Sequence, residues 1–323
     1  MRVARSLGEV EAPLEAPVVT VGNFDGVHRG HQRILETVVE EARRQRGTAV
    51  AVTFEPPPSK VLRPEAAPPL LTTLEQKLAL LEAAGLDLAV VVPFTREFSQ
   101  LSPRAFADEV LHRGLGATLV CVGESFRFGQ RQAGDVALLR ELAREFGFGV
   151  RVVAPVVFRR QTASSSLVRQ LIQKGEVARA GRLLARPYAL TGSVEPGAGR
   201  GRTLDFPTLN LLPEQECLPA RGVYATETVV NGRAFPSATN VGVRPTFGGE
   251  KLVVESHLLD FRETVTAVRL EVRFHERLRA ERKFPSGEAL REQVQQDVER
   301  TRRFFARRHR LVARRPRGVT AAD

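Results

Sequence analysis

The chain has 323 residues, a length at which two domains of ordinary size are expected. Hydrophobic residues make up 42% of it and charged residues 26%, which is typical of globular proteins and excludes a disordered or fibrous chain. No stretch approaches the ~20 apolar residues of a membrane helix, and the N-terminus lacks the apolar core of a signal peptide. The two cysteines, Cys121 and Cys217, have no partners at metal-ligand spacing and indicate a reducing compartment. We therefore expect a soluble, cytoplasmic protein without a membrane partner.

The formal net charge is +11, and much of the excess lies in an arginine-rich run near the C-terminus. This run comprises Arg302, Arg303, Arg307, Arg308, Arg310, Arg314, Arg315 and Arg317. It is compatible with nucleic-acid binding and with a solvated helix end that continues into a frayed tail. We favour the second interpretation and expect no nucleic-acid partner, because no aromatic and basic recognition motif accompanies the run.

Short β-branched runs alternate with helical patterns in the first half of the chain. Strands are expected at 18–22, 48–54, 88–94, 118–123 and 150–156. Helices are expected at 31–45, at 74–84, after Ser102 and Pro103, and from Asp135 to Phe146. Continuous apolar strands separated by amphipathic helices are typical of a parallel sheet covered on both faces. Ligands of such sheets bind at the carboxyl ends of the strands.

The second half, from Tyr188 onward, consists of short alternating runs with turn residues between them. These runs are YALTGSVEPG, GVYATETVVNGR, FPSATNVGV, KLVVESHLLDF and AVRLEVRF. They predict an antiparallel barrel or sandwich, followed by one closing helix from about Glu288 to Arg307. Pro187 ends a helical pattern and begins an extended one, which predicts two domains, at 1–186 and 187–323.

The segment GNFDGVHRGH, Gly22 to His31, links the first strand to a helix. Backbone N–H groups and the positive end of the helix dipole meet there, which suits phosphate binding. His28 and His31 share one face of the helix start and can donate hydrogen bonds to phosphate oxygens. A chance pair of surface histidines and a metal site with Asp25 are the alternatives. We prefer phosphate chemistry, because a strand precedes and a helix follows, and the other nucleotide-binding candidates are Gly22, Asn23, Phe24 and Asp25.

Two further stretches can complete this site, and their candidate residues are Gly123, Arg127, Ser164, Ser165 and Arg169. The loop GESFRFGQRQAGD follows a strand end and can face the same crevice, but an ordinary loop with a solvated arginine would have the same pattern. The stretch TASSSLVR puts hydroxyls at a helix start and an arginine just inside it, which suits phosphate oxygens. Helix capping alone would also explain its serines.

The histidine segment resembles the signature of the nucleotidyltransferase superfamily with an HxGH motif. Together with FEPPP, LTTLEQKLALL, the loop and SSSLVR, in this order, it is similar to the N-terminal module of the bacterial bifunctional riboflavin kinase/FAD synthetase family. The resemblance implies a Rossmann-like domain in which both histidines and nearby amides hold ATP while the FMN phosphate attacks the α-phosphorus and pyrophosphate leaves. Pro57 stands where the family has a histidine, and Leu167 replaces a basic residue.

A second candidate site lies in GRGRTLDFPTLNL, Gly199 to Leu211, where glycines and arginines lead into an extended run. Thr208 and Asn210 are two residues apart and are expected on one face of a strand. A hydroxyl and an amide oxygen suit a Mg²⁺ ion bound to a nucleotide. A polar strand end after a flexible loop is an equally simple explanation.

This segment resembles the riboflavin kinase signature, with Asp205 where a glycine is usual, and TNVGVRPTFGG, VESHLLDF and ERKFPSGEAL follow in the family's order. The resemblance implies that Thr208 and Asn210 hold Mg-ATP. It also implies a phosphate-covering loop that contains Gly199, Gly201, Arg202 and Thr203. Glu255 matches the family's catalytic carboxylate, the general base toward the ribityl hydroxyl that attacks the γ-phosphate. The alternative for Glu255 is a solvent-facing strand residue.

The two resemblances cover the chain from about Pro17 to Phe305. They predict a bifunctional enzyme that uses Mg²⁺ and ATP to phosphorylate riboflavin to FMN, and ATP again to adenylylate FMN to FAD. One alternative is a riboflavin kinase whose adenylyltransferase half is weak or lost, because of Pro57. The other is a flavin-responsive nucleic-acid-binding regulator that uses the arginine-rich run.

Overall fold

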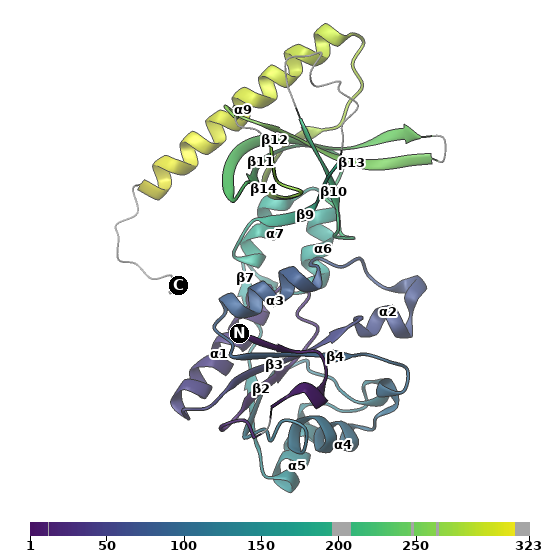
Figure 1. The fold of residues 1–323 in the computed structure, drawn as a ribbon, viewed down its shortest axis with the longest axis vertical. Helices are drawn as coiled ribbons and strands as arrows, with labels where there is room; N and C mark the ends of the chain where they lie inside the picture. Colours follow the sequence, from purple (N-terminus) through teal and green to yellow (C-terminus); the bar gives the residue numbers. More distant parts are fainter. Residues whose placement is uncertain (12, 196–207, 247–248, 263–264, 314–323) are drawn as a thin grey trace. The chain divides into compact units, whose positions relative to one another are not determined.

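A computed structural model of the chain describes residues 1–11, 13–195, 208–246, 249–262 and 265–313 (Figure 1). The chain divides into two compact units, Met1–Ser166 and Leu167–Asp323, and helix α6 (Ser165–Gln173) contains the division. The boundary at Pro187 that the sequence predicts, between domains 1–186 and 187–323, stays a prediction. Among the described residues, no helix has the length and apolar character needed to cross a membrane.

The first unit is built on a six-stranded sheet in which every pairing is parallel. In spatial order its strands are β1 (Arg2–Ala4), β4 (Leu88–Pro93), β3 (Ala49–Glu55), β2 (Val18–Val21), β5 (Leu119–Gly123) and β6 (Gly149–Val153). All four residues of β2 are buried, because its side chains point alternately into two cores, one on each face of the sheet. The predicted parallel sheet is confirmed, and the edge strand β1 is an addition to it.

Helices cover both faces of this sheet (Figure 1). They are α1 (Arg29–Arg44), α3 (Leu74–Ala83), α4 (Pro103–Phe106) with a π-helical continuation (Ala107–His112), and α5 (Val136–Phe146). The short helix α2 (Pro58–Leu62) follows β3 and contributes no residue to either core. A short hairpin, β7 (Val157–Phe158) and β8 (Gln161–Thr162), precedes α6. The carboxylate of Asp135 accepts the backbone N–H of Leu138 at 3.0 Å and caps α5, as its position in the sequence predicts.

The second unit contains a closed, six-stranded antiparallel barrel. In spatial order its strands are β10 (Leu209–Pro213), β13 (Gly249–Leu258), β12 (Arg233–Thr246), β11 (Gly222–Val230), β14 (Arg269–Ala280) and β9 (Tyr188–Glu195). Helix α7 (Val177–Leu184) precedes the barrel, and α9 (Gly287–Ala313) follows it. Because β9 pairs with both β10 and β14, the sheet closes on itself, and the architecture is the predicted barrel and not a sandwich.

The barrel interior contains a network of hydroxyl groups. Its members are Thr226, Thr228, Ser237, Thr239 and Ser256, which are all 0% exposed. Five oxygen–oxygen contacts of 2.5 to 3.0 Å join them across three strands. Because every hydroxyl has a partner, the desolvation cost of burying these polar groups is offset. The rings of Tyr224 and Phe274, in edge contact at 5.3 Å, fill more of the interior.

Helix α9 packs on the outer surface of the barrel. Phe305 lies against Val223, Ala225 and Leu278, whose side chains point away from the hydroxyl network. The buried carboxylate of Asp297 in α9 accepts one bifurcated hydrogen bond from Nε of Arg279, at 2.9 and 3.2 Å from its two oxygens, and one of these oxygens lies 2.8 Å from Nη2 of the same arginine. An ion pair in this setting is costly to break by removing one partner, and it fixes the helix to β14.

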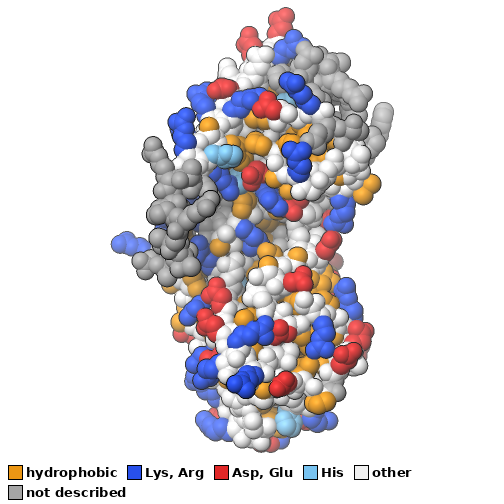
Figure 2. Space-filling view, turned by 60° about the vertical axis from the view of Figure 1, so that its left-hand side comes forward, with side chains coloured by type: hydrophobic (Ala, Val, Ile, Leu, Met, Phe, Trp, Pro, Cys, Tyr) orange, Lys and Arg blue, Asp and Glu red, His pale blue; other side chains and the backbone are white. Residues whose placement is uncertain are grey.

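Two residues of the arginine-rich run, both in α9, have acidic partners in the described structure. Both nitrogen tips of Arg302 bond to Asp260 at 2.7 Å, and Arg303 lies 3.3 Å from a carboxylate oxygen of Glu299. On the face in Figure 2, Lys and Arg side chains are interspersed with Asp and Glu. These contacts favour the interpretation as a solvated helix end. The last members of the run, from Arg314 onward, lie outside the described residues.

Candidate active sites

The turn after β2 is tight, and its conformation depends on glycine. The N–H of Gly22 donates to the carbonyl of Val52 at 3.0 Å, and a Cβ at Gly22 would lie 3.0 Å from the ring of Phe24. Phe24 and Gly26 both have positive φ, of 47° and 77°. The chain therefore reverses within a few residues and leads from the end of β2 to the start of α1.

Asp25 holds this turn against the segment before α3. Its carboxylate accepts hydrogen bonds from the backbone N–H groups of Leu71 at 3.0 Å and Thr72 at 3.2 Å, and from the Thr72 hydroxyl at 3.2 Å. Its carbonyl accepts the hydroxyl of Ser165 at 2.9 Å. The structure thus brings Ser165 to the turn. Nothing among the described residues supports the metal alternative, since no group of three or more metal-ligating side chains occurs there.

His28 is the N-cap of α1, so the helix begins two residues earlier than the sequence predicts. Its Nδ1 accepts the backbone N–H groups of Gly30 at 3.1 Å and His31 at 3.4 Å. An imidazole that accepts at Nδ1 carries its proton on Nε2, so Nε2 of His28 is a hydrogen-bond donor. The cap thereby fixes both the ring orientation and the tautomer.

His31 stacks on His28, with ring centroids 3.8 Å apart and an angle of 20° between the planes. Burial, the neighbouring His28 and the charge of Lys77 lower the pKa of His31 well below the usual 6.5. Its Nδ1 is buried and has no hydrogen-bond partner among the described residues. The two rings therefore form a stacked pair at the positive end of α1, in which the low pKa keeps His31 predominantly neutral near pH 7.

Gly30, between the two histidines, allows their close approach. A Cβ there would lie 3.0 Å from Cε1 of His28 and 3.4 Å from the carbonyl of Ala163. We expect Gly30→Ala to displace the His28 ring and to lower the rate of FAD formation about 10-fold, since misplaced catalytic groups lose transition-state stabilisation. Assays of both activities would check this, and a parallel loss of kinase activity would contradict it.

The other candidates of the first unit are less closely gathered. Gly123 ends β5, the strand beside β2, and a Cβ on it would contact Ile34 of α1 at 3.5 Å. The exposed guanidinium of Arg127 donates to the carbonyl of Phe126 in its own loop at 3.0 Å. Asn23 is exposed at the turn, Ser164 directly precedes α6, and Arg169 lies one turn into that helix, in the second unit.

The barrel brings Asn210 and Glu255 together. They are directly paired across β10 and β13, and Glu255 is also paired with Asn240 of β12. Side chains in such pairs lie about 4.5–5.5 Å apart at Cβ and share one face of the sheet. This face is the outer one, because the next residue of β13, Ser256, belongs to the interior network. On the other side, Asn210 is paired with Glu195 of β9. Four polar residues therefore lie in a row across four neighbouring strands, which we call the polar row: Glu195, Asn210, Glu255 and Asn240.

Thr208 is half-buried and directly precedes β10, two residues before the 6% exposed Asn210. The remaining loop candidates, Gly199, Gly201, Arg202 and Thr203, lie outside the described residues.

Three neighbours of these sites carry little or no signal in the sequence. Lys77 lies in a helix where a lone lysine is normally solvated, but it is 3% exposed. Asn240 and Glu195 join the row only through strand pairings between distant segments. The single available signal is that Asn240 lies within TNVGVRPTFGG, one of the stretches of the family resemblance.

The fold and both sites define a class of enzyme. A parallel sheet with two histidines at a helix N-terminus is suited to phosphate transfer from a nucleotide, and the barrel adds a carboxylate beside oxygen ligands. The FAD synthetase family model matches residues 11–167, and the riboflavin kinase family model matches residues 184–305.

Relatives match over nearly the whole chain. The bifunctional riboflavin kinase/FMN adenylyltransferase of Escherichia coli K12 is 35% identical, over 94% of this chain and 98% of the relative. That of Bacillus subtilis is 34% identical, over 90% and 92%. A crystal structure described as a macrolide-efflux protein from Streptococcus pneumoniae has a TM-score of 0.85 and 28% identity, over 93% and 98%.

The chain belongs to the family of bifunctional riboflavin kinase/FMN adenylyltransferases. It is an ATP-dependent kinase and nucleotidyltransferase of flavin biosynthesis, with riboflavin, FMN, FAD and ATP as its substrates or products.

Proposed function

We propose that the two reactions take place at the two separate sites described above. The observation that carries this proposal is that the two candidate sets lie on different sheets. The histidine pair is at the end of β2, in the region matched by FAD synthetase, and the Asn210–Glu255 pair is in the barrel matched by riboflavin kinase. On this proposal, residues 187–323 make FMN and residues 1–186 convert it to FAD.

In the adenylyltransferase site, His28 and His31 bind the ATP phosphates at the N-terminus of α1. His28 donates from Nε2, because its Nδ1 is held by the helix backbone. The turn from Gly22 and the hydroxyl of Ser165 border the same place. An oxygen of the FMN phosphate attacks the α-phosphorus, the bond to the β-phosphate breaks, and pyrophosphate leaves. The histidines stabilise charge that develops on the phosphate oxygens, so no protein nucleophile is needed.

In the kinase site, Glu255 takes the proton of the ribityl hydroxyl as that oxygen attacks the γ-phosphorus of ATP. Thr208 and Asn210 hold the nucleotide and its Mg²⁺, and Gly199 to Thr203 cover the phosphates. The donor set fits this ion, since the hydroxyl of Thr208 and the amide oxygen of Asn210 are hard ligands of the kind that it prefers. The bound ion would neutralise charge on the phosphate oxygens.

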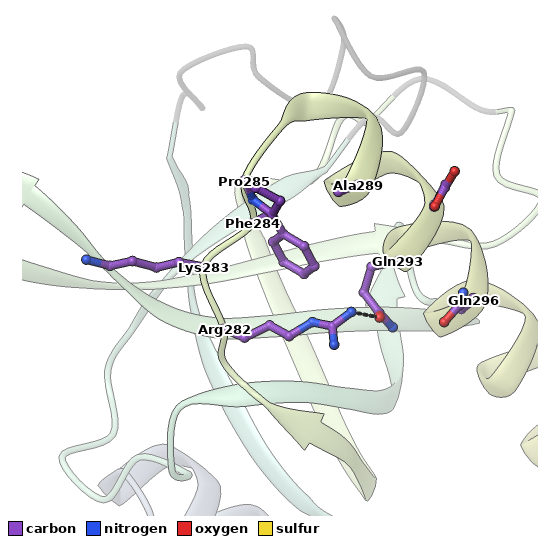
Figure 3. Close-up of a pocket in the computed structure, with 8 residues that line it drawn as sticks. Arg282, Lys283, Phe284, Pro285, Ala289, Gln293 and Gln296 are labelled. Atoms are coloured by element: carbon purple, nitrogen blue, oxygen red, sulfur yellow. Dashed lines mark hydrogen bonds between the residues drawn. The ribbon is translucent and has the colours of Figure 1, made fainter.

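The flavin ring has a candidate position beside the kinase row. A hollow of about 330 Å³ lies between the segment after β14 and α9, and Phe284 lines it (Figure 3). The Arg282 guanidinium lies 4.8 Å from the centre of the Phe284 ring. The adjacent Glu281 is near the row, since a Cβ on Gly242 would be 2.5 Å from its Oε1 and 3.0 Å from Nδ2 of Asn240. We place the ring of riboflavin against Phe284, with its ribityl chain toward Glu255.

In the first unit, half-buried phenylalanines offer a corresponding surface. Phe94 follows β4 and contacts Phe98 with ring centroids 5.7 Å apart, and Phe126 stacks on Phe128 at 5.5 Å. These rings lie beyond the carboxyl ends of β4 and β5, at the edge of the sheet where β2 also ends. A planar flavin is suited to such a surface.

A time course of products from riboflavin, ATP and Mg²⁺ tests the proposal. We expect FMN to appear first and FAD to follow, and we expect FAD directly from supplied FMN. Pro57 is buried and is the N-cap of α2, so the expected histidine is absent, but the pair at 28 and 31 is intact. Formation of FMN without FAD would contradict this expectation and favour a kinase whose other half is lost.

The proposed location is the cytoplasm. Cys121 and Cys217 are both buried and neither forms a disulfide in the described structure, as expected of thiols in a reducing compartment.

A further inference from the structure

Lys77 is a buried ammonium group close to the histidine pair. It lies in the first turn and a half of α3, whose start is fixed by a capping box between Thr73 and Gln76. Asp25 fixes the preceding residues to the turn after β2. Two sets of backbone contacts therefore hold α3 in position, and Lys77 is only 3% exposed as a result. A lysine is rarely buried to this extent without a compensating anion.

The contacts of Lys77 do not compensate its charge. Among the described residues, its Nζ makes one hydrogen bond, to the hydroxyl of Thr53 at 3.3 Å, and no ion pair. An ammonium has three hydrogens, so two further acceptors can bind. Burial lowers the pKa of Lys77, while the charges of Glu55 and Asp25 act in the opposite direction. A partly satisfied buried charge costs stability, which argues for a role in binding and not in folding.

His31 is the second group with unused capacity in this region. Its Nδ1 is buried without a partner among the described residues, and the charge of Lys77 is one of the influences on its titration. Lys77 lies in α3 and His31 lies in α1, and both side chains are near the carboxyl ends of β2 and β3. The hydroxyl of Thr53 links the two strands' ends, since it also lies 3.4 Å from the carbonyl of Asn23.

We propose that Lys77 is a phosphate-binding residue of the adenylyltransferase site, whose Nζ donates to a phosphate oxygen of a bound substrate beside His31. The phosphate belongs either to ATP or to FMN, both of which this site must bind. A point charge with free N–H groups is well suited to hold it. The same charge stabilises the transition state when negative charge moves to the leaving pyrophosphate.

Substitution of Lys77 by methionine tests the proposal, because methionine keeps the length of the side chain and removes the charge. We expect kcat/KM for FAD formation to fall about 100-fold. We expect Lys77→Arg to retain more activity than Lys77→Met. The thermal stability of the variant should be unchanged or higher, since an incompletely paired buried charge is removed. The substrate whose KM rises identifies the phosphate: ATP if Lys77 binds the triphosphate, FMN if it binds the flavin phosphate.

Thr53→Val is the matched variant, because it removes the hydrogen-bond partner and leaves the ammonium. We expect a change of less than about threefold in FAD formation. If Lys77 served only as an anchor to Thr53, both variants would show the same loss. Hydrogen exchange of residues 18–55 reports whether the first unit is folded. FAD formation by folded Lys77→Met within threefold of wild type would overturn the proposal. Wild-type protein that makes no FAD from FMN would instead overturn the assignment of the site.

Discussion

The variant Glu255→Gln is expected to lose FMN formation from riboflavin and to keep the conversion of supplied FMN to FAD. Glutamine preserves the size and hydrogen-bonding shape of the side chain, and its pairing with Asn210 and Asn240 in the sheet remains possible. A neutral amide does not accept the proton of the ribityl hydroxyl. General-base catalysis contributes typically about 10²–10⁴-fold, so we expect the kinase rate to fall by at least 100-fold. Chromatography of the products from riboflavin and from FMN measures both rates in one preparation.

Glu276→Gln is a suitable control for this experiment. Glu276 is an exposed glutamate in a strand of the same barrel and is not part of the polar row. Its replacement should leave both activities at the wild-type level. If folded Glu255→Gln lost both activities, two separate sites would be contradicted. FMN formation at close to the wild-type rate would contradict the assignment of the base.

The variants His28→Ala and His31→Ala are expected to lose FAD formation and to retain riboflavin kinase activity. Each removes one ring of the stacked pair, and His28→Ala also removes the acceptor for two backbone N–H groups of α1. Loss of one donor to a developing oxyanion costs about 10²–10³-fold in rate. The measurement is the rate of FAD formation from FMN at saturating ATP, with kinase activity measured alongside.

His112→Ala provides the comparison, because His112 is an exposed histidine of the same unit, stacked on Phe146. It should leave FAD formation unchanged. The low pKa of His31 adds a second readout, since the ring is neutral near pH 7. We therefore expect no His31 protonation step in the wild-type kcat/KM for FAD formation between about pH 6.5 and pH 8. Unchanged FAD production by both alanine variants would refute the role of the pair.

Local patterns in the sequence were sufficient to predict most of the fold. Strands β2 to β5 are continuous apolar runs, and each of their ends lies within one residue of the predicted end. Strand β1 has three residues, Arg2 to Ala4, and is too short to carry a periodic pattern. The choice between barrel and sandwich depends on whether β9 pairs with β14, about 80 residues later, which no local pattern encodes.

The site residues also fall into those that the sequence predicts and those that it does not. His28 and His31 could be found because their spacing, the preceding strand and the following helix are contiguous in the sequence. Asn240 could not be found from the sequence, because its position beside Glu255 follows from the register of β12 against β13. Lys77 could not be found from the sequence either, since its burial results from how α3 is held against the turn at Asp25. Local sequence patterns therefore did not predict the contacts between segments that are distant in the sequence.

The hydroxyl network has a consequence for how the kinase exchanges its substrates. Side chains fill the barrel and Glu255 lies on its outer surface. If Glu255 is the base proposed above, flavin and nucleotide reach its carboxylate without passing between strands. No strand pairing has to open during a catalytic cycle. Substitutions that strengthen the barrel interior can therefore raise the thermal stability of this unit without slowing turnover, which is an exception to the usual trade-off between rigidity and activity.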